Sequence, residues 1–512
     1  MLSARILDLR PGAAWVFSGD RWRSGASWIA PYDHPALETL AVRDGRRVFF
    51  HVRERLPGCS VENTCVPALL DERAYDASLA AARDWPRGHL LAEVTEAGFT
   101  LSAGHCCPAP VYYSVAGEEL HLHWDLAVLR GLLPHQGLDE VEVPRLLTLS
   151  GYYSRRTVWS AASMLTERSA LCFDGTSVTV REPRPALHET ARVLDEDADV
   201  VGGYERLLNA VLADTWYVPE RTAVELSGGM DSSNVALSLA ARHGSLPRAG
   251  ALVHDGEVGA QQMRRRRELL AVTGFDDTVV RAADFPPLDP QSRPAWRLGP
   301  QEETYIAAHS RLLRSWVADG VLWVATGVGG DEMLSLTPAE RGSQRQYRPP
   351  VPPWLTERAV EALADGESGI PPAPPVSDSV LRAIACGAPM YLRSGLWPLY
   401  PLADHAAWRF GQWLPVEWRR DKRLARERMA RAGLSRQVTH PPLRESFHGV
   451  LQEAVQRFAP EQVREVMKGS PLLDFGFLDA GELAAAAERL ERGVSAQDEM
   501  IVHVLRLHAA LT

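Results

Sequence analysis

Residues 222–233 read TAVELSGGMDSS, a short apolar run followed by two glycines and a cluster of small hydroxyl side chains. The run is typical of a buried strand, and the following SSNVALSLAARH is typical of a helix that ends at Gly244. We therefore expect Leu226 to end a strand, Ser227–Asp231 to form a turn and Ser232 to begin a helix. A helix N-terminus offers unpaired N–H groups, and glycines allow the backbone to approach a ligand closely. The stretch predicts a phosphate-binding loop.

The use of lysine narrows the kind of loop. Of the 55 lysines and arginines, only Lys422 and Lys468 are lysines. A Walker A loop requires a lysine between glycine and Ser or Thr, but these two follow Asp421 and Met467, so that loop is excluded. Because arginine is used everywhere else, a remaining lysine is a candidate for a compact point charge that arginine cannot replace.

A second glycine-rich turn, TGVGGDE at 326–332, follows the predicted strand VLWVA. An aspartate inside an anion-binding loop repels phosphate unless a cation intervenes, so Asp231 is predicted to bind Mg²⁺ that bridges to a nucleotide. The carboxyl ends of parallel strands meet at one edge of a sheet, and Asp331 is therefore expected to be the second carboxylate. Either stretch alone is also compatible with a simple tight turn after a strand. Their pairing, each with an aspartate, favours a shared nucleotide site.

The order of apolar runs predicts two domains, as expected for a chain of 512 residues. Residues 1 to about 185 alternate short apolar runs with turns, which is typical of an antiparallel β-rich domain. After a linker rich in proline and acidic residues, helices and strands alternate, from a helix that begins at Val200 to one at about 303–318. This alternation predicts a parallel sheet covered by helices, and the last hundred residues predict amphipathic helices. The predicted domains are 1–190 and 191–512.

The composition limits the classes of partner. The formal net charge of −10 argues against a nucleic-acid partner, because backbone binding needs clustered positive charge. The run Arg264–Arg267 is a local exception, and we expect either a solvated helix face or a contact with an acidic ligand. The chain has no stretch of about 18 apolar residues and no apolar core of signal-peptide length near its start, so we expect no membrane association and a cytoplasmic location.

Cysteine usage gives a weaker signal. Six scattered cysteines without a CxxC pair predict free thiols in a reducing compartment. The adjacent Cys106 and Cys107 beside His105 form one cluster that suggests a metal. No second pair matches it, so a metal site there is not favoured.

Five segments resemble one family in the same order along the chain. SGGMDS at 227–232 resembles the pyrophosphate loop SGGxDS of the N-type ATP pyrophosphatases, the PP-loop enzymes, and TGVGGDE resembles the second nucleotide motif of class B asparagine synthetases. YPLADH at 400–405 is similar to the family's PFLDH stretch, DKRLAR at 421–426 to its lysine segment near the active site, and AGHCCPAPVYY at 103–113 to RDxxGxxPLYY of its amino-terminal domain. The resemblance covers nearly the whole chain.

This resemblance implies an α+β amino-terminal domain, glutaminase-like and a degenerate Ntn-hydrolase with an antiparallel β-rich sandwich. An α/β PP-loop domain with a parallel sheet and a helical carboxy-terminal part would follow. The implied activity is that of an AMP-forming ligase: ATP adenylates a carboxylate and releases pyrophosphate, and an amine then attacks the acyl-adenylate. Lys422 would stabilise the negative charge that builds on phosphate and on the oxyanion, and Asp231 and Asp331 would hold Mg²⁺. The residues implied to bind ATP are Leu226, Ser227, Gly228, Gly229, Asp231, Ser232, Gly327 and Gly329.

Departures from the family bear on the substrate. Glutamine-dependent members expose a nucleophilic cysteine as the first residue of the mature chain, whereas here Leu2 follows Met1 and the first cysteine is Cys59. We therefore expect no glutaminase activity and an amine supplied by the substrate itself. β-Lactam synthetases and lasso peptide cyclases also lack that cysteine. β-Lactam synthetases carry Tyr at the position of Val328, and a partner Glu in the region that in this chain reads ACGAPMYLRS, at 385–394. Asparagine synthetases carry Glu at the position of Val328. Neither arrangement is present.

An α-amine, with a pKa near ~8, needs little help when a carboxylate is held beside it. The GGDE form of the second turn also resembles lasso cyclases. We therefore predict a lasso-type macrolactam cyclase that acts on a precursor peptide, with a leader-peptide-binding protein and a leader peptidase as candidate partners. The alternatives are a β-lactam synthetase-like or other small-molecule amide synthetase, an RNA-modifying PP-loop enzyme, and a scaffold that binds nucleotide or peptide without turnover. The sequence does not identify a general base, and Val328 is a candidate pocket residue.

Overall fold

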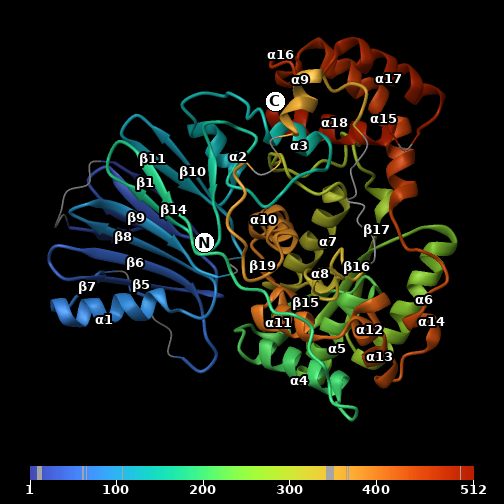
Figure 1. Ribbon diagram of the computed structural model, residues 1–512, viewed down its shortest axis with the longest axis horizontal. Coiled ribbons are helices and arrows are strands. Elements are labelled where there is room, and N and C mark those ends of the chain that lie inside the picture. Colours follow the sequence, from blue (N-terminus) through green and yellow to red (C-terminus); the bar gives the residue numbers. More distant parts are fainter. Residues whose placement is uncertain are drawn as a thin grey trace. The chain divides into compact units, whose positions relative to one another are not determined.

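The computed structural model divides the chain into two compact units, which Figure 1 shows as ribbons. The first unit comprises Met1–Glu142, Tyr152–Ala186 and Glu367–Pro374, and the second comprises Val143–Gly151, Leu187–Gly366 and Pro375–Thr512. The structure describes residues 1–7, 14–59, 63–64, 66–105, 108–341, 351–364, 366, 368–495 and 497–512.

The first unit contains two seven-stranded sheets. In the described strands, β5 and β7 pair in parallel and the other pairs in these two sheets are antiparallel. One sheet has the order β12 (Ser163–Leu165), β10 (Val111–Ala116), β11 (Glu119–His123), β1 (Leu2–Ile6), β4 (Ser27–Pro31), β3 (Arg21–Ser24), β2 (Val16–Ser18). The other has the order β14 (Val178–Arg181), β13 (Ala170–Phe173), β9 (Gly98–Ala103), β8 (His89–Thr95), β6 (Val48–Glu54), β5 (Leu37–Arg43), β7 (Ala68–Leu69).

Aromatic side chains join the two sheets of this unit. Trp22 of β3 and Phe50 of β6 are fully buried, and their ring centroids lie 4.9 Å apart. On the opposite face of the second sheet, Tyr75 of α1 (Glu72–Arg83) packs against Phe49. Alternate residues of β6 thus face two different apolar layers. The predicted antiparallel β-rich sandwich is confirmed.

The second unit is built on a five-stranded parallel sheet, which confirms the predicted α/β architecture. Its order is β17 (Asp276–Arg281), β16 (Arg248–Val253), β15 (Thr222–Glu225), β18 (Trp323–Ala325), β19 (Trp397–Leu399). The connecting helices include α4 (Val200–Ala213), α5 (Met230–His243), α6 (Gly256–Thr273), α7 (Ile306–Ala318), α8 (Gly330–Met333) and α10 (Asp378–Arg393). The strand β19 was not predicted. It lies at the edge of the sheet, where Pro398 costs no ladder hydrogen bond on its outer side.

The carboxy-terminal part of this unit is helical, as predicted. After β19 come η4 (Pro401–Ala403), α11 (His405–Trp413), α12 (Val416–Arg419), η5 (Arg420–Lys422), α13 (Arg423–Arg431), α14 (Arg436–Thr439), α15 (His448–Lys468), α16 (Pro471–Asp474), α17 (Ala480–Arg492), η6 (Asp498–Met500) and α18 (Ile501–Leu511). No helix in the described parts of the chain combines the length and the apolar character needed to cross a bilayer.

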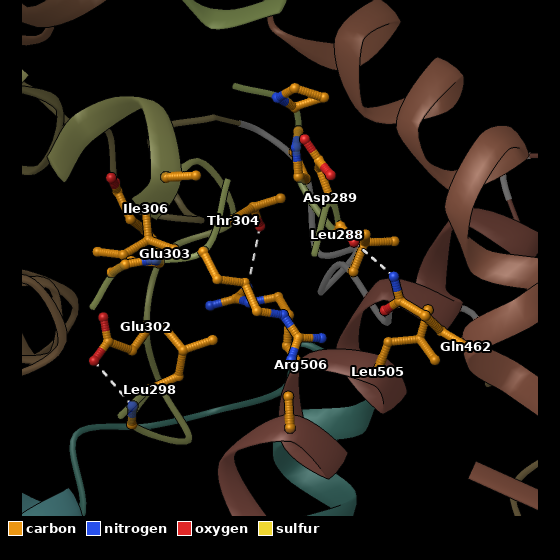
Figure 2. Close-up of a pocket in the computed structure, with 17 residues that line it drawn as sticks. Leu288, Asp289, Leu298, Glu302, Glu303, Thr304, Ile306, Gln462, Leu505 and Arg506 are labelled. Carbon is orange, nitrogen blue, oxygen red and sulfur yellow. Dashed lines mark hydrogen bonds between the residues drawn. The ribbon is translucent and has the colours of Figure 1, made fainter. Parts of the chain in front are cut away.

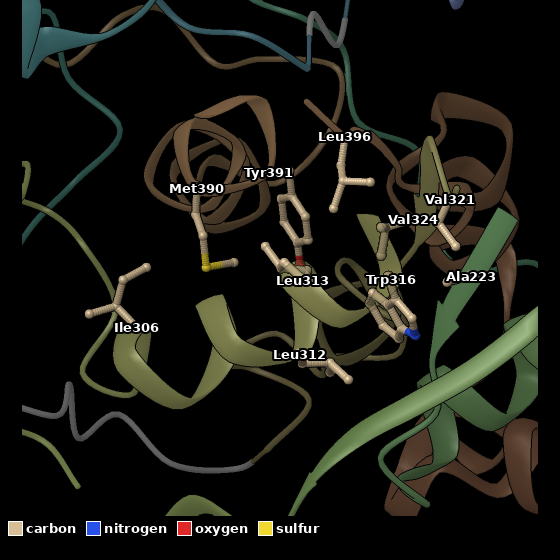
Figure 3. Packing of buried hydrophobic residues seen from close by; sticks show 10 residues of the cluster. All are labelled: Ala223, Ile306, Leu312, Leu313, Trp316, Val321, Val324, Met390, Tyr391 and Leu396. Carbon is tan, nitrogen blue, oxygen red and sulfur yellow. The ribbon is translucent and has the colours of Figure 1, made fainter. Parts of the chain in front are cut away.

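The core of the second unit fixes α7 against the sheet (Figure 3). Trp316 and Leu312 of α7 pack with Ala223 of β15 and Val324 of β18 in one buried cluster. A Cβ atom at Gly250 of β16 would lie 2.5 Å from the Trp316 ring, so this glycine is required for the close approach of helix and sheet. In a strand–helix–strand unit the helix runs back along the sheet, so the first turn of α7 lies near the carboxyl ends of the strands.

Element boundaries agree with the sequence at some positions and differ at others. The helix α4 begins at Val200, as predicted, and Gly244 ends α5 with a left-handed φ of 61°. The helix α5 begins at Met230 and not at Ser232, because Gly229 already has the extended backbone of an N-cap. The helix predicted at 303–318 begins at Ile306.

The prediction of a solvated face for Arg264–Arg267 is wrong for half of the run. Arg265 and Arg266 are 3% and 0% exposed. Arg265 forms a 2.6 Å ion pair with Glu445, and Arg266 contacts Asp277. These two guanidinium groups are buried because the fold places carboxylates beside them, and no local sequence pattern reveals those carboxylates.

Cys59, Cys172 and Cys386 are not in disulfide bonds, as predicted. Cys65, Cys106 and Cys107 lie outside the described residues, and so does the metal cluster considered for the last two.

Candidate nucleotide site

The first loop connects β15 to α5. Leu226 is fully buried, and its N–H donates to the Gly250 carbonyl at 2.8 Å, which extends the parallel pairing by one residue. Gly228 has a φ of 91°, a left-handed conformation that favours glycine. The Gly229 N–H donates to Ser227 Oγ at 3.1 Å, and Ser232 Oγ lies 3.1 Å from the same oxygen. The two serine hydroxyls therefore meet across the mouth of the turn, at the N-terminus of α5.

The buried side-chain amide of Gln262 fixes the loop through hydrogen bonds. Gln262 of α6 is 2% exposed, and its Nε2 donates to the carbonyls of Ser227 and Leu252 at 3.0 Å each. Its Oε1 accepts the His254 N–H at 3.0 Å. One side chain thus joins the loop to the end of β16, so the loop conformation is preformed.

The second loop packs directly on the first. A Cβ atom at Gly327 would lie 2.8 Å from the Ser232 nitrogen, and one at Gly330 would lie 2.4 Å from Asp231 Cγ. Gly329 has a φ of 97°, and its Cβ would lie 2.8 Å from the Leu402 carbonyl oxygen. Gly327 and Gly330 are therefore needed for the contact between the two loops, and Gly329 for the contact of the second loop with η4. The structure places Gly327 beside the first loop and Gly329 against η4, and their assignment to a nucleotide site stays a prediction.

Lys422 joins the two predicted metal ligands. Its Nζ lies 2.5 Å from Asp231 Oδ2 and 2.6 Å from Asp331 Oδ1. The side chains of Lys422 and Asp231 are 23% and 18% exposed, whereas that of Asp331 is 81% exposed. Asp421 and Lys422 both have left-handed backbones, with φ of 50° and 54°, a conformation that costs about 1–2 kcal/mol per residue. This strained turn places the ammonium of Lys422 beside the two carboxylates.

The charges in this cluster are not balanced. Burial raises the pKa of Asp231; Lys422 opposes this effect, and Asp331 and Glu332 reinforce it. Burial by itself would lower the pKa of Lys422, but the carboxylates of Asp231 and Asp331 outweigh it and raise that pKa. One ammonium therefore contacts two carboxylates, and Glu332 acts on Asp231 as a third, so carboxylates outnumber cations in the cluster.

The donor set fits a Mg²⁺ ion that is shared with a ligand. The contacting oxygens of Asp231 and Asp331 lie within about 5 Å of each other, since both touch one nitrogen, and carboxylate oxygens are the hard ligands that Mg²⁺ prefers. The described residues contain no group of three or more His, Cys, Asp or Glu side chains arranged for a metal. Phosphate oxygens and water would therefore have to complete the coordination shell.

A second polar cluster, which the sequence did not reveal, lies at the end of β15. Glu225 Oε1 is 2.6 Å from His309 Nε2 and accepts a 2.5 Å hydrogen bond from Tyr391 Oη. His309 Nδ1 is 2.5 Å from Glu303. Burial alone would lower the pKa of His309, but the two carboxylates outweigh it and raise that pKa well above its usual value. The sequence signal for this cluster was Glu225, a carboxylate at the end of an apolar strand and directly before the loop.

Val328 contributes no polar group to the site. It packs, partly buried, with Tyr400 against Val380, Ile384 and Ala403. Burial raises the pKa of the Tyr400 phenol, which disfavours its ionised form.

Comparisons with known proteins give little further information. No protein-family model matches the chain, and neither does any curated protein. Among solved structures, the U34-tRNA thiolase NcsA from Methanococcus maripaludis, with its 4Fe-4S cluster, is similar at 13% sequence identity and a TM-score of 0.25. The alignment covers 58% of this chain and 81% of the thiolase. A likeness of this size carries no argument about activity. The class of protein is therefore defined by its own architecture: a β-sandwich unit, and a parallel α/β unit whose strand ends carry two interlocked glycine-rich loops.

Proposed function

We propose that the second unit is an ATP-utilising enzyme of the PP-loop type. The observation that carries this proposal is the position of Lys422, whose ammonium contacts Asp231 of the first loop and Asp331 of the second. A phosphate-binding turn that lacks lysine of its own needs positive charge from elsewhere. The N-terminus of α5 supplies part of it, and the ammonium lies beside that terminus.

In this proposal the loop residues Ser227, Gly228, Gly229 and Ser232 bind the pyrophosphate part of ATP through hydroxyls and backbone N–H groups. Leu226 anchors the loop by its buried side chain. Asp231 and Asp331 would hold Mg²⁺, which when bound neutralises phosphate charge. Lys422 donates to the oxygens on which negative charge develops.

The finer proposal is an amide-forming ligase. A substrate carboxylate attacks the α-phosphorus of ATP, so that an acyl-adenylate forms and pyrophosphate leaves; an amine then displaces AMP and loses a proton. We propose a peptide precursor as that substrate and macrolactam closure as the reaction, as in lasso cyclases. The apolar packing of Val328 supports this choice, because it leaves no polar pair for a β-lactam nitrogen at that position.

The test is pyrophosphate release with Mg²⁺ and ATP, measured with panels of precursor-type peptides, small amino acids and tRNA. We expect release with a peptide, together with loss of one water from that peptide by mass spectrometry. Lys422→Met should lower the rate about 10²–10³-fold, the usual loss when one donor to a developing oxyanion is removed. The matched control is Lys468→Met, which changes the one other lysine, whose side chain is 70% exposed.

Each other outcome has a defined meaning. Turnover with small amino acids alone would favour a β-lactam synthetase-like or other small-molecule synthetase. Tight, salt-sensitive tRNA binding with tRNA-dependent turnover would favour an RNA-modifying enzyme. Equal rates for the two lysine variants would overturn the assignment of the site, and glutamine hydrolysis above background would overturn the expectation that the first unit is silent.

A further inference from the structure

A pocket in the second unit lies apart from the two glycine-rich loops. It has a volume of about 580 Å³, counting the part open to solvent, and lies between the segment before α7 and the helices α15 and α18. Its walls are mostly apolar and include Leu288, Leu298, Ile306 and Leu505. Figure 2 shows that the long side chain of Arg506, from α18, extends among them.

Arg506 makes few direct contacts for its charge, although the carboxylates of Glu302 and Glu303 act on it from the same pocket. Its Nη1 donates to Thr304 Oγ1 at 3.1 Å, and within the described residues it forms no ion pair. Glu302 and Glu303, which line the pocket with Asp289, also have other partners. Glu302 contacts Arg393 and accepts the Gly299 N–H at 2.9 Å, and Glu303 lies 2.5 Å from His309.

With one hydrogen bond to the described residues, the guanidinium has unused donors within a pocket whose walls are mostly apolar. Burial lowers the pKa of Arg506 and outweighs the opposing effect of Glu302 and Glu303, yet arginine stays charged in proteins. A carboxylate is the group that best satisfies such a fork, because it accepts two parallel N–H bonds. The exposed Arg293 at the rim adds a second positive charge.

The pocket is held open by its own framework. Leu288 at the rim has a left-handed backbone, with a φ of 64°, and Gln462 Nε2 of α15 donates to its carbonyl at 2.6 Å. Leu505 and Ala509 of α18 also line the pocket. A preformed apolar pocket with one convergent charged group is the usual form of a small-molecule site.

We propose that this pocket binds a carboxylate carried on a short apolar group, as found in a free apolar amino acid or at the apolar C-terminus of a peptide. The carboxylate pairs with Arg506 and Thr304, and the apolar group contacts Leu298 and Leu505. The pocket lies toward the same edge of the sheet as the first glycine-rich loop, since Ile306 lines it and His309, one turn later on α7, contacts Glu225 at the end of β15. The proposal does not depend on nucleotide chemistry.

The test measures binding to the full chain, without ATP, by calorimetry and by ligand-observed NMR. The probes are N-acetyl-leucine, which mimics a peptide C-terminus, leucine, and leucinamide, which lacks the carboxylate. We expect N-acetyl-leucine or leucine to bind with a Kd below about 10 mM, and leucinamide to bind at least about tenfold more weakly. A preference for the acetylated probe identifies a peptide terminus, and a preference for leucine identifies a free amino acid.

Two variants locate the binding site. Arg506→Gln removes the charge and should weaken binding at least about tenfold, and Ala509→Phe should abolish binding by filling the pocket while the guanidinium remains. Arg206→Gln is the matched control, because that side chain is 74% exposed on α4, and it should change nothing. The proposal is overturned if neither acid binds at this concentration, if leucinamide binds as well as the acids, or if Ala509→Phe binds like the wild type.

Discussion

Replacement of Lys422 by methionine tests the charge arrangement of the site without any knowledge of the substrate. Methionine keeps most of the length and apolar surface of the lysine stem but removes the ammonium. Asp231, whose side chain is 18% exposed, then loses its 2.5 Å partner while Asp331 and Glu332 continue to repel it.

The expected loss of stability can be worked from the burial of the two partners. Breaking a fully buried ion pair costs about 3–5 kcal/mol. Here about one fifth of each side chain reaches water, so we expect about 2–3 kcal/mol from the contact with Asp231. The contact with Asp331 adds less than about 1 kcal/mol, because that carboxylate is largely exposed.

A double variant separates charge from packing. In Lys422→Met with Asp231→Asn both partners are neutral, so most of the lost stability should return. In the single variant Lys422→Met, the pKa of Asp231 rises further above its unfolded value. Its contribution is therefore most unfavourable at neutral pH and shrinks as the pH falls and the carboxyl takes up a proton.

The measurement is hydrogen exchange of the amides in β15 and α5 at pH 7.5 and at pH 5, since a chain with two compact units need not unfold in one step. Lys468→Met is the control and should change stability by less than about 0.5 kcal/mol. The reasoning is refuted if Lys422→Met costs no more than this control. It is also refuted if the double variant is as unstable as the single one.

Three further outcomes are expected elsewhere in the chain. Gly330→Ala places a Cβ 2.4 Å from Asp231 Cγ and should lower the free energy of unfolding in urea by about 1–3 kcal/mol. Gly387 lies on a helix, and a Cβ there meets nothing within 4 Å. Gly387→Ala should therefore stabilise the chain by a few tenths to about 1 kcal/mol. Burial lowers the pKa of His51 to about 2, so stability of the first unit should fall as the pH drops below about 6.5; His51→Phe should flatten this slope in acid-unfolding curves, and an unchanged slope would contradict the assignment. The raised pKa of His309 gives stability that is complete below about pH 6.5 and is lost as the pH rises through the higher folded value; the deficit of His309→Gln should therefore shrink at alkaline pH, and a deficit that grows there would be inconsistent with this charge state.

The parts of the site that the sequence predicted are those set by local patterns. The strand–loop–helix order around Gly228 follows from an apolar run, a glycine pair and a helical period, all within about twenty residues. The prediction that Asp231 and Asp331 share one sheet edge needed only the rule for parallel strands. The pairing of both with Lys422 could be approached only by resemblance, since 191 residues separate Lys422 from the first of them.

The parts that the sequence missed depend on partners distant along the chain. Glu225 and His309 are 84 residues apart, and nothing local distinguishes either residue as a member of a polar cluster. From the sequence, Arg266 is one of four arginines expected to be solvated, but in the fold it contacts Asp277. Gly330 reads as a flexible turn residue, whereas its role is to leave room for the Asp231 side chain. In each case tertiary contact decides what the residue does.

The geometry also separates the roles of the two aspartates. Asp231 is packed against Gly330 and contacts the ammonium, so its position is fixed by steric contact on one side and by charge on the other. Asp331 contacts the same ammonium from an exposed position, where water screens it and its side chain has room to turn. A phosphate bound at the loop would add negative charge to a cluster that already has more carboxylates than cations. Binding of a polyphosphate therefore requires a further cation, and the exposed Asp331 is the ligand freer to reorient toward it.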